Sequence, residues 1–341
     1  MKELLNELFS YKTISRENAY GVMLRIAKGD FSNSLVASFL TIYNMRSITL
    51  DELAGFREAL QEMCVPVNLS AYDPIDLSGT GGDGKNTFNI STLASFIVSG
   101  AGQAVVKHGN NGVSSICGSS NLLSHFGYEF SSDKDTLRRS LDAAGICYLH
   151  APLFHPALKN IATVRKELGV KTFFNMLGPM INPASPKKQI TGVFSLELAR
   201  LYGYLYQNTD KKYQIIHSLD GYDEISLTSD FKIIHAGGES IISPGMLGFD
   251  QISPKAINGG NSIEKSADIF LKILAGKGTT EQNNVAISNA GLALYCGKEL
   301  SSFTEGISIA KESLESGKAL ESFKKFLSPE KTFMHISHGN T

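Results

Sequence analysis

The sequence carries almost no net charge and has no apolar run long enough to cross a membrane. Its 32 lysines and arginines balance 33 aspartates and glutamates, which leaves a formal net charge of −1. Proteins that bind nucleic acid through a general electrostatic field have a clear basic excess, so any anion site must be local here. A membrane-spanning helix needs about 20 consecutive apolar residues. We therefore expect neither a nucleic-acid nor a membrane partner.

Cysteine is scarce and shows no metal-ligand spacing. The cysteines are Cys64, Cys117, Cys147 and Cys296. This scattered distribution is typical of a reduced, cytoplasmic protein. The N-terminal residues carry Glu3 and Glu7 within their apolar pattern and lack the core of a signal peptide, which favours the same location. No pattern for covalent catalysis accompanies Cys117, so we interpret it as a small residue in a tight turn.

The spacing of apolar residues along the chain predicts an α/β protein with two parts. Residues 1–65 show helical spacing of apolar residues without a strand pattern, and Thr49–Glu52 is typical of a helix N-terminus. After residue 72, short apolar strands alternate with helical patterns. We expect a small all-helical domain plus a larger domain with a mostly parallel sheet covered by helices on both faces. The expected strands are 75–77, 104–106, 146–149, 190–193, 213–217 and 232–235, and a last helical stretch covers 267–327.

Two turns rich in glycine and hydroxyl groups follow consecutive expected strands. The first covers residues 79–84 and precedes a helix that begins near Ser91. The second covers residues 112–120 and follows a strand end that carries Lys107 and His108. Glycine lets backbone N–H groups converge on a ligand, and helix N-termini add positive potential. The two turns therefore predict a binding site for a multiply charged phosphate.

Neither common phosphate-binding motif accounts for the first turn. A dinucleotide fingerprint through Gly79, Gly81 and Gly84 requires an acidic residue about 20 residues later, where the chain has Lys107. A Walker A motif requires Ser or Thr after Lys85, but Asn86 stands there.

The stretch instead resembles the anthranilate phosphoribosyltransferases, a class related to the pyrimidine nucleoside phosphorylases. The similarity covers nearly the full chain in order. The matching blocks are Gly79–Asp83, Asn89–Thr92, Lys107–Asn110, Arg165–Gly169, Phe174–Pro179 with Asn182 and Pro183, and Gly221–Glu224.

The resemblance implies both an activity and a domain layout. The enzyme would transfer the phosphoribosyl group of 5-phosphoribosyl 1-diphosphate to the amine of anthranilate, giving N-(5-phosphoribosyl)anthranilate and diphosphate in tryptophan biosynthesis. It would need Mg²⁺, and it would form a homodimer through the helical domain. That domain would comprise 1–70 with 155–182 returning to it, and the α/β domain would comprise 71–154 and 183–341. We expect displacement at the anomeric carbon and nominate no general base.

Binding of phosphoribosyl diphosphate requires many hydrogen-bond donors to its phosphate oxygens. The first turn supplies backbone N–H groups, and side-chain donors follow it. Ser91 or Thr92 has an alternative role as a helix N-cap, and Lys107 an alternative as a surface lysine. We favour phosphate binding because the turn has more glycines than a tight connection requires. The candidates are Gly79, Gly82, Asp83, Thr87, Asn89, Ile90, Ser91, Thr92, Lys107, Ser115 and Ser119.

Adjacent carboxylates at Asp223 and Glu224 follow an expected strand. Such a pair is often a solvated loop, but a site rich in phosphate gives a reason for Mg²⁺, which binds a few carboxylates plus waters and substrate oxygens. By the resemblance, the metal residues are Ser91, Asp223 and Glu224, and Asp83 acts through a water.

Anthranilate carries a carboxylate, for which the guanidinium fork of Arg165 is suited. The alternative for Arg165 is an ordinary solvated helix face. His108 either contacts the aromatic substrate or only shapes its turn. By the resemblance, Arg165 faces the site from the helical domain. The anthranilate candidates are Gly79, His108, Asn110, Arg165, Gly178 and Pro179.

The second turn departs from the family pattern. Asn111, Gly112 and Ile116 stand where the family usually has Arg, Ser and Lys. The lost cations predict weaker binding of phosphoribosyl diphosphate and a raised KM, unless another cation such as Lys85 compensates. Two alternatives remain: a pyrimidine nucleoside phosphorylase, which lacks several of these blocks, and an inactive relative that binds nucleic acid. The balanced charge and the Asp223–Glu224 pair disfavour the latter.

Overall fold

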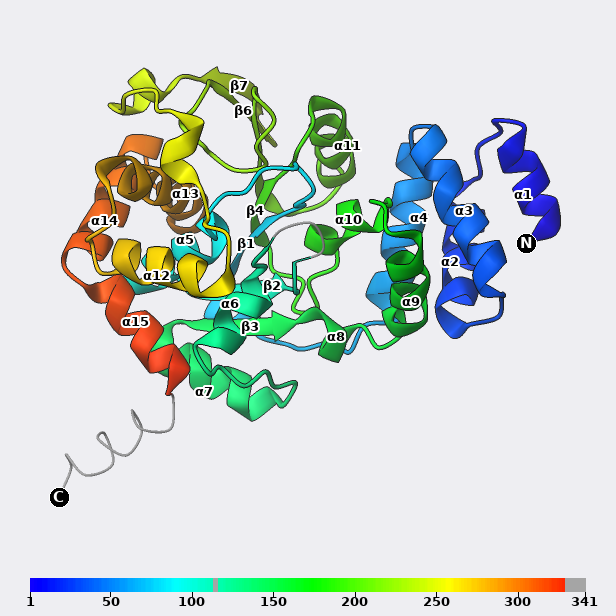
Figure 1. Ribbon diagram of the computed structural model, residues 1–341, viewed down its shortest axis with the longest axis horizontal. Coiled ribbons are helices and arrows are strands. Elements are labelled where there is room, and N and C mark those ends of the chain that lie inside the picture. The colour runs from blue at the N-terminus through cyan, green and yellow to red at the C-terminus, as the bar shows by residue number, and fades with distance from the viewer. Residues whose placement is uncertain (113–115, 329–341) are drawn as a thin grey trace. The chain divides into compact units, whose positions relative to one another are not determined.

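The computed structural model describes residues 1–112 and 116–328, and these form two compact units (Figure 1). The helical unit consists of Met1–Val67 and Ala151–Ser185. The sheet unit consists of the described residues of 68–150 and 186–328. Along the described residues, the chain passes from the helical unit into the sheet unit, returns once to the helical unit and then re-enters the sheet unit.

The helical unit is built around an aromatic cluster to which both of its chain segments contribute. Phe173 of the returning segment stacks on Phe56, with 4.8 Å between ring centroids, and both contact Phe39 and Tyr43 edge-on. The returning segment is thus part of this core. The elements are α1 (Lys2–Phe9), α2 (Arg16–Lys28), α3 (Asn33–Met45), α4 (Leu50–Glu62), α8 (Ala151–Phe154), α9 (Leu158–Leu168), α10 (Phe174–Leu177) and the 3₁₀ helix η2 (Gly178–Met180).

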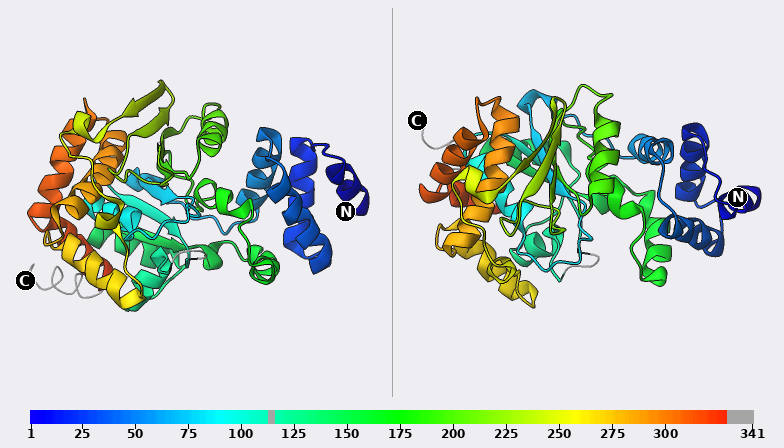
Figure 2. Two further views of the ribbon diagram at one scale, coloured as in Figure 1. Left: turned by 45° about the horizontal axis from the view of Figure 1, so that its top comes forward. Right: turned by 90° about the horizontal axis from the view of Figure 1, so that it is seen from above.

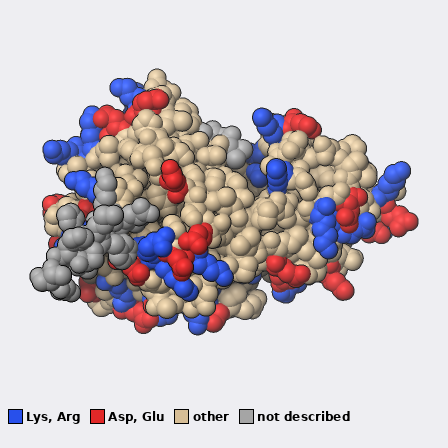
Figure 3. Space-filling view, turned by 90° about the horizontal axis from the view of Figure 1, so that it is seen from below, with Lys and Arg blue, Asp and Glu red and all other residues tan. Residues whose placement is uncertain are grey.

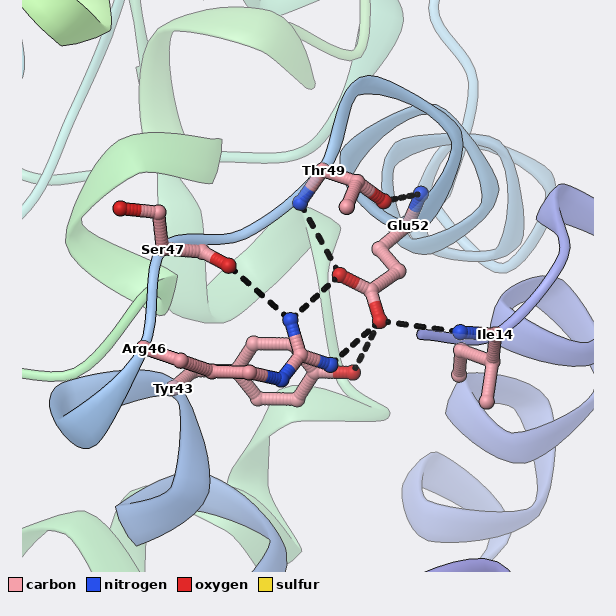
Figure 4. Close-up of polar contacts among 6 residues, drawn as sticks. All are labelled: Ile14, Tyr43, Arg46, Ser47, Thr49 and Glu52. Carbon is pink, nitrogen blue, oxygen red and sulfur yellow. Dashed lines mark hydrogen bonds and ion pairs between the residues drawn. The ribbon is translucent and has the colours of Figure 1, made fainter. Parts of the chain in front are cut away.

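The N-terminus of α4 carries the predicted capping signal and a buried ion pair (Figure 4). The Thr49 side chain accepts from the Glu52 N–H at 3.3 Å, and the Glu52 carboxylate accepts from the Thr49 N–H at 2.9 Å. Glu52 is fully buried and also accepts two hydrogen bonds from Arg46, at 2.6 and 2.9 Å. The Ile14 N–H and the Tyr43 hydroxyl donate to the same carboxylate. One acidic group therefore joins α3, α4 and the α1–α2 loop.

The sheet unit contains a seven-stranded sheet in the order β3-β2-β1-β4-β5-β6-β7. The first five strands in this order pair in parallel. Strand β6 pairs antiparallel with both β5 and β7. The fold class predicted from the sequence is thereby confirmed. The strands are β1 (Ile75–Gly79), β2 (Val105–Gly109), β3 (Ile146–His150), β4 (Lys188–Gly192), β5 (Lys212–Ser218), β6 (Phe231–His235) and β7 (Gly238–Ile242).

Helices cover both faces of this sheet (Figure 2). On one face α5 (Ile90–Gly100) contacts β1 and β2, and α13 (Thr280–Lys298) contacts β4 and β5. On the other face α11 (Leu196–Tyr206) contacts β5 and β6. Almost every residue of α5 is buried, which explains its continuous apolar composition. The remaining elements are α6 (Ser119–His125), α7 (Lys134–Ala144), α12 (Ile263–Leu274), α14 (Phe303–Glu315), α15 (Lys318–Leu327) and the 3₁₀ helices η1 (Ser70–Tyr72), η3 (Pro244–Leu247) and η4 (Pro254–Ile257).

Surface charge agrees with the balanced composition. On the face drawn in Figure 3, the described lysines and arginines are interspersed with aspartates and glutamates. None of the helices among the described residues is both long and apolar enough to span a bilayer.

Candidate active site

The candidate site lies at the carboxyl ends of the central parallel strands. Gly79 ends β1 and pairs with Gly192, which ends β4. The neighbouring strand β5 leads into the loop that carries Asp223 and Glu224. Because ligands of open α/β sheets bind beyond the carboxyl ends of the strands, this edge is the expected place for a substrate.

The two paired glycines leave room for the acidic loop. A Cβ atom at Gly192 would overlap the main-chain oxygen of Asp223, and one at Gly79 would lie 2.5 Å from its Oδ2 atom. The Gly81 N–H, in the left-handed region at φ +62°, donates to Asp223 Oδ2 at 2.7 Å. The glycine turn thus binds the first acidic residue directly.

The second acidic residue is bound by the start of α5. The Ser91 N–H donates to Glu224 Oε1 at 2.9 Å. The helix begins at Ile90, so Ser91 and Thr92 lie inside its first turn and neither occupies the N-cap position. Asn89 occupies that position, and its amide donates to Cys117 O at 2.8 Å. The alternative role of Ser91 or Thr92 as the cap is therefore wrong.

Lys107 is buried beside this pair. Its Nζ atom donates to Leu77 O at 2.7 Å and to Ser91 Oγ at 3.2 Å, and only 3% of the residue is exposed. The alternative of a surface lysine is therefore wrong. Burial lowers the pKa of Lys107 to about 8, although Asp76 and Glu224 act in the opposite direction.

Electrostatics favour a cation next to the two carboxyl groups. Burial, together with the carboxylate of Asp83, raises the pKa of Asp223 to about 7. Burial, followed by the Asp223 charge, raises the pKa of Glu224 well above its ordinary value. A bound cation would stabilise both carboxylates. The two acidic side chains line one small cavity with Leu77, Ser78, Ser91, Ala94, Ile190, Gly192, Ile216 and Asn289.

In residues 1–112 and 116–328, no three His, Cys, Asp or Glu side chains gather in a metal-binding group. A hard cation here would take further oxygen donors from a hydroxyl such as that of Ser91, from water and from a bound phosphate.

The other candidates of the first turn lie close by in the chain and differ in exposure. Gly82, Asp83 and Thr87 are partly exposed, and Asp83 Oδ1 accepts from the Lys85 N–H at 2.9 Å. Ile90 and Thr92 are buried. The Lys85 ammonium lies 4.6 Å from the centroid of the Tyr222 ring, next to the acidic pair in sequence.

The second turn is described only in part, and Ser115 lies outside the described residues. Ser119 opens α6, and its hydroxyl is 2.7 Å from the Tyr148 hydroxyl. Ser120 contacts the same Tyr148 hydroxyl at 2.8 Å and His150 Nδ1 at 2.9 Å. Tyr148 is a fully buried residue that sequence reasoning missed, because a single tyrosine in a strand resembles any core aromatic.

Two anthranilate candidates of the sheet unit lie at the end of β2: His108 within the strand and Asn110 directly after it. His108 is 8% exposed, and its N–H lies 3.5 Å from Asp76 Oδ1. Asn110 is exposed, its main-chain oxygen accepts from the Ser120 N–H at 3.1 Å, and its side chain accepts from the Asn111 N–H at 2.8 Å. Both of the alternatives for His108, a substrate contact and a shaping role, remain compatible with this position.

The remaining anthranilate candidates belong to the helical unit. Arg165 lies on α9, donates to Asn175 Oδ1 at 3.2 Å and stands 5.5 Å from the Phe174 ring centroid. Burial lowers its pKa. Arg165 is therefore held by α10 rather than forming an ordinary solvated helix face. Gly178 and Pro179 begin η2, and a Cβ atom at Gly178 would meet nothing within 4 Å.

Comparisons with known proteins agree over most of the chain. The glycosyl transferase family a/b domain matches residues 71–320, and the helical bundle domain of the same family matches residues 2–64. The chain is 58% identical to the anthranilate phosphoribosyltransferase of Christiangramia forsetii and 57% identical to that of Flavobacterium psychrophilum. Each comparison covers 95% of this chain and 98% of the relative.

Solved structures give the same result. The anthranilate phosphoribosyltransferase of Thermus thermophilus matches with a TM-score of 0.88 at 30% identity, over 95% of this chain and 98% of that chain. The Saccharomyces cerevisiae enzyme, solved in complex with PRPP and Mg, matches with a TM-score of 0.87 at 28% identity, over 95% of this chain and 96% of that chain. A second yeast structure, at 26% identity with a TM-score of 0.84 over the same shares, holds 4-fluoroanthranilate.

Proposed function

Because the chain belongs to the anthranilate phosphoribosyltransferase family, we propose that the site around Asp223 and Glu224 carries out the family's reaction. The resemblance seen in the sequence is thereby confirmed. The protein transfers the phosphoribosyl group of 5-phosphoribosyl 1-diphosphate to the amine of anthranilate and releases diphosphate, a step of tryptophan biosynthesis.

The observation that carries the site assignment is the pair of hydrogen bonds between the glycine turn and the acidic loop. The Gly81 N–H binds Asp223 and the Ser91 N–H binds Glu224. The proposed phosphate-binding turn and the two carboxylates therefore lie together at the carboxyl ends of the strands. Oxygen donors of this kind, together with a cavity beside them, fit Mg²⁺. Asp223, Glu224 and the Ser91 hydroxyl would hold the cation, with Asp83 acting through a water. When bound, Mg²⁺ would neutralise charge on the diphosphate leaving group.

The phosphoribosyl diphosphate residues act by binding and orientation. The Thr80 and Gly81 N–H groups are bonded to Gly192 O and Asp223 Oδ2. The other backbone N–H groups of the Gly79–Gly84 turn donate to phosphate oxygens, and the helix N-terminus at Ile90 adds positive potential. Lys107 stands beside both as a buried cation. Ser119, held against Tyr148, contributes a hydroxyl from the second turn. The anomeric carbon is thus presented to the amine, and no residue is required as a strong base.

The anthranilate carboxylate is bound by Arg165. Its contacts with Asn175 and Phe174 fix the guanidinium, which reduces the entropy lost on binding. The yeast relative that binds 4-fluoroanthranilate supports an aromatic acid as this substrate. The family resemblance further assigns Gly79, His108, Asn110, Gly178 and Pro179 to anthranilate binding.

We also propose a homodimer formed through the helical domain, in the cytoplasm. Phe9 and Met45 of the helical unit are 57% and 72% exposed and are apolar groups that a partner would cover. All four cysteines are buried and unpaired, as expected in a reducing compartment.

One experiment tests the activity and the metal site together. Anthranilate fluorescence is followed with phosphoribosyl diphosphate and Mg²⁺, with EDTA as a control. We expect a loss of signal that requires the metal and that disappears in the double variant Asp223→Asn/Glu224→Gln. A flat trace for the folded wild-type protein would contradict the proposed function. Retained activity in the double variant would contradict the metal site alone.

A further inference from the structure

The residue that follows the acidic pair is bound by an asparagine from α13. Asn289 Oδ1 accepts from the Ile225 N–H at 3.1 Å, and its Nδ2 group donates to Ile225 O at 2.8 Å. The same Nδ2 group donates to Val285 O at 2.9 Å, one turn earlier in the helix. Asn289 is 6% exposed. Both main-chain groups of Ile225 are therefore held by a single buried amide.

A serine of β5 holds the same loop by further hydrogen bonds. Ser218, at the end of β5 and fully buried, donates from its hydroxyl to Glu224 O at 2.7 Å. Its oxygen also accepts from the Ser226 N–H at 3.4 Å. Leu227 stands in the left-handed region at φ +57°, which is unfavourable for a side chain of this size. Specific side-chain bonds, rather than regular strand pairing, thus fix the main chain from Glu224 to Ser226.

The helix that carries Asn289 is a rigid support. It begins with a capping box between Thr279 and Gln282, and residues 285–294 are all buried. It packs against α5, whose first turn holds Glu224 through Ser91. Packed helices therefore hold both the Glu224 side chain, through α5, and the main chain of Ile225 that follows it, through α13.

We infer that Asn289 is a positioning residue for the Asp223–Glu224 pair and that it sets the affinity of the site for a divalent cation. This inference rests on the proposed function. Both amide hydrogens of Asn289 are engaged, on Ile225 and Val285, so Asn289 acts through the loop although it lines the same cavity as the carboxyl groups. Groups that orient ligands in this way typically change metal affinity by about 10–100-fold when removed.

The test compares Asn289→Ala with Asn283→Ala, a matched control on the same helix. The Asn283 amide lies 3.5 Å from Gly278 O near the start of α13 and does not contact the acidic loop. Mn²⁺ affinity is measured by electron paramagnetic resonance with phosphoribosyl diphosphate present. The Mg²⁺ concentration for half-maximal transfer, kcat at saturating Mg²⁺ and the urea midpoint are measured on the same proteins.

We expect Asn289→Ala to weaken Mn²⁺ binding and to raise the Mg²⁺ requirement about 10-fold or more. Saturating Mg²⁺ should restore kcat to within a few-fold, because the acidic ligands are still present. Asn283→Ala should match the wild type in cation affinity. A lower urea midpoint with unchanged Mn²⁺ affinity in Asn289→Ala would overturn the inference, since that is the result of a purely structural role.

Ser218→Ala provides a second variant if Asn289→Ala does not fold. It removes the hydroxyl that donates to Glu224 O and accepts from the Ser226 N–H, and we expect a smaller loss of Mn²⁺ affinity in the same direction. Unchanged affinity in Ser218→Ala would then overturn the inference. Failure of the proposed function has a different signature, a wild-type protein without Mg²⁺-dependent transfer. In that case, the Mn²⁺ affinities of the variants and the wild type still test the inference.

Discussion

At Gly192, one additional methyl group would occupy the space of the acidic loop. The Cβ atom of Gly192→Ala would overlap the main-chain oxygen of Asp223, which cannot move as a flexible side chain can. We expect this variant to lose about 1–3 kcal/mol of stability and most of its transferase activity, because the proposed metal residues Asp223 and Glu224 would be displaced. Urea unfolding and the anthranilate fluorescence assay measure the two effects.

Gly21→Ala is the matched control for that substitution. Gly21 lies inside α2, and its Cβ atom would meet nothing within 4 Å. Alanine in a helix interior is favoured over glycine by about 0.5–1 kcal/mol, so stability should rise and activity should stay unchanged. Equal activity in Gly192→Ala and Gly21→Ala would contradict the close approach at β4.

His155 predicts a loss of stability in mild acid. It is 3% exposed, its Nε2–H donates to Ile181 O at 2.9 Å, and burial lowers its pKa from 6.5 to about 4. Between these two values the unfolded chain binds a proton that the folded chain does not, so stability decreases as the pH falls. From pH 7 to pH 5 the expected loss is about 2 kcal/mol.

Urea unfolding of wild type and His155→Gln over this pH range measures the effect. Glutamine keeps an N–H donor for Ile181 O but does not titrate. We expect a shallower pH dependence in the variant by the same amount. Parallel curves for the two proteins would show that the pKa of His155 is the same in the folded and unfolded states.

Among elements, the N-terminus of α4 depends on its buried ion pair. Glu52→Gln leaves the Arg46 guanidinium, which is 9% exposed, without a carboxylate partner. Breaking a buried pair in this way costs about 3–5 kcal/mol. Glu58→Gln is the comparison, because it breaks the exposed pair with Arg16, which is worth about 0–1 kcal/mol. Urea unfolding of both variants checks the difference, and similar losses would contradict the role of burial.

The same elements show what the sequence can predict. The Thr49–Glu52 cap and six of the strands were predicted because each signal is local, a spacing of a few residues. The fourth strand begins at Lys188 rather than 190 because the buried Lys188 ammonium pairs with Asp73 and with Gly297 O. The edge strand β7 was missed because Gly238–Ile242 is almost fully exposed and has no apolar alternation.

The candidate site shows which of its residues the sequence alone could not predict. Resemblance identified Asp223, Glu224 and the glycine turn by their motifs. The sequence did not indicate that Asn289 supports the acidic loop or that Tyr148 contacts Ser119, because each acts through a hydrogen bond to a residue 29 or more positions away. Such contacts are created by the sheet order and by helix packing, so no local pattern records them.

For the molecule as a whole, the two units should respond differently to phosphoribosyl diphosphate with Mg²⁺. A ligand present at 100 times its Kd stabilises the state it binds by about 2.7 kcal/mol. Most of the proposed contacts lie in residues 79–92 and 223–224, with Lys107 and Ser119 as further contacts, so amide hydrogen exchange should slow most in peptides covering 79–92 and 223–224. Peptides of α2 in the helical unit should change less. The Asp223→Asn/Glu224→Gln variant, treated identically, should show little protection. Strongest protection in α2, or equal protection in the double variant, would place the ligand elsewhere.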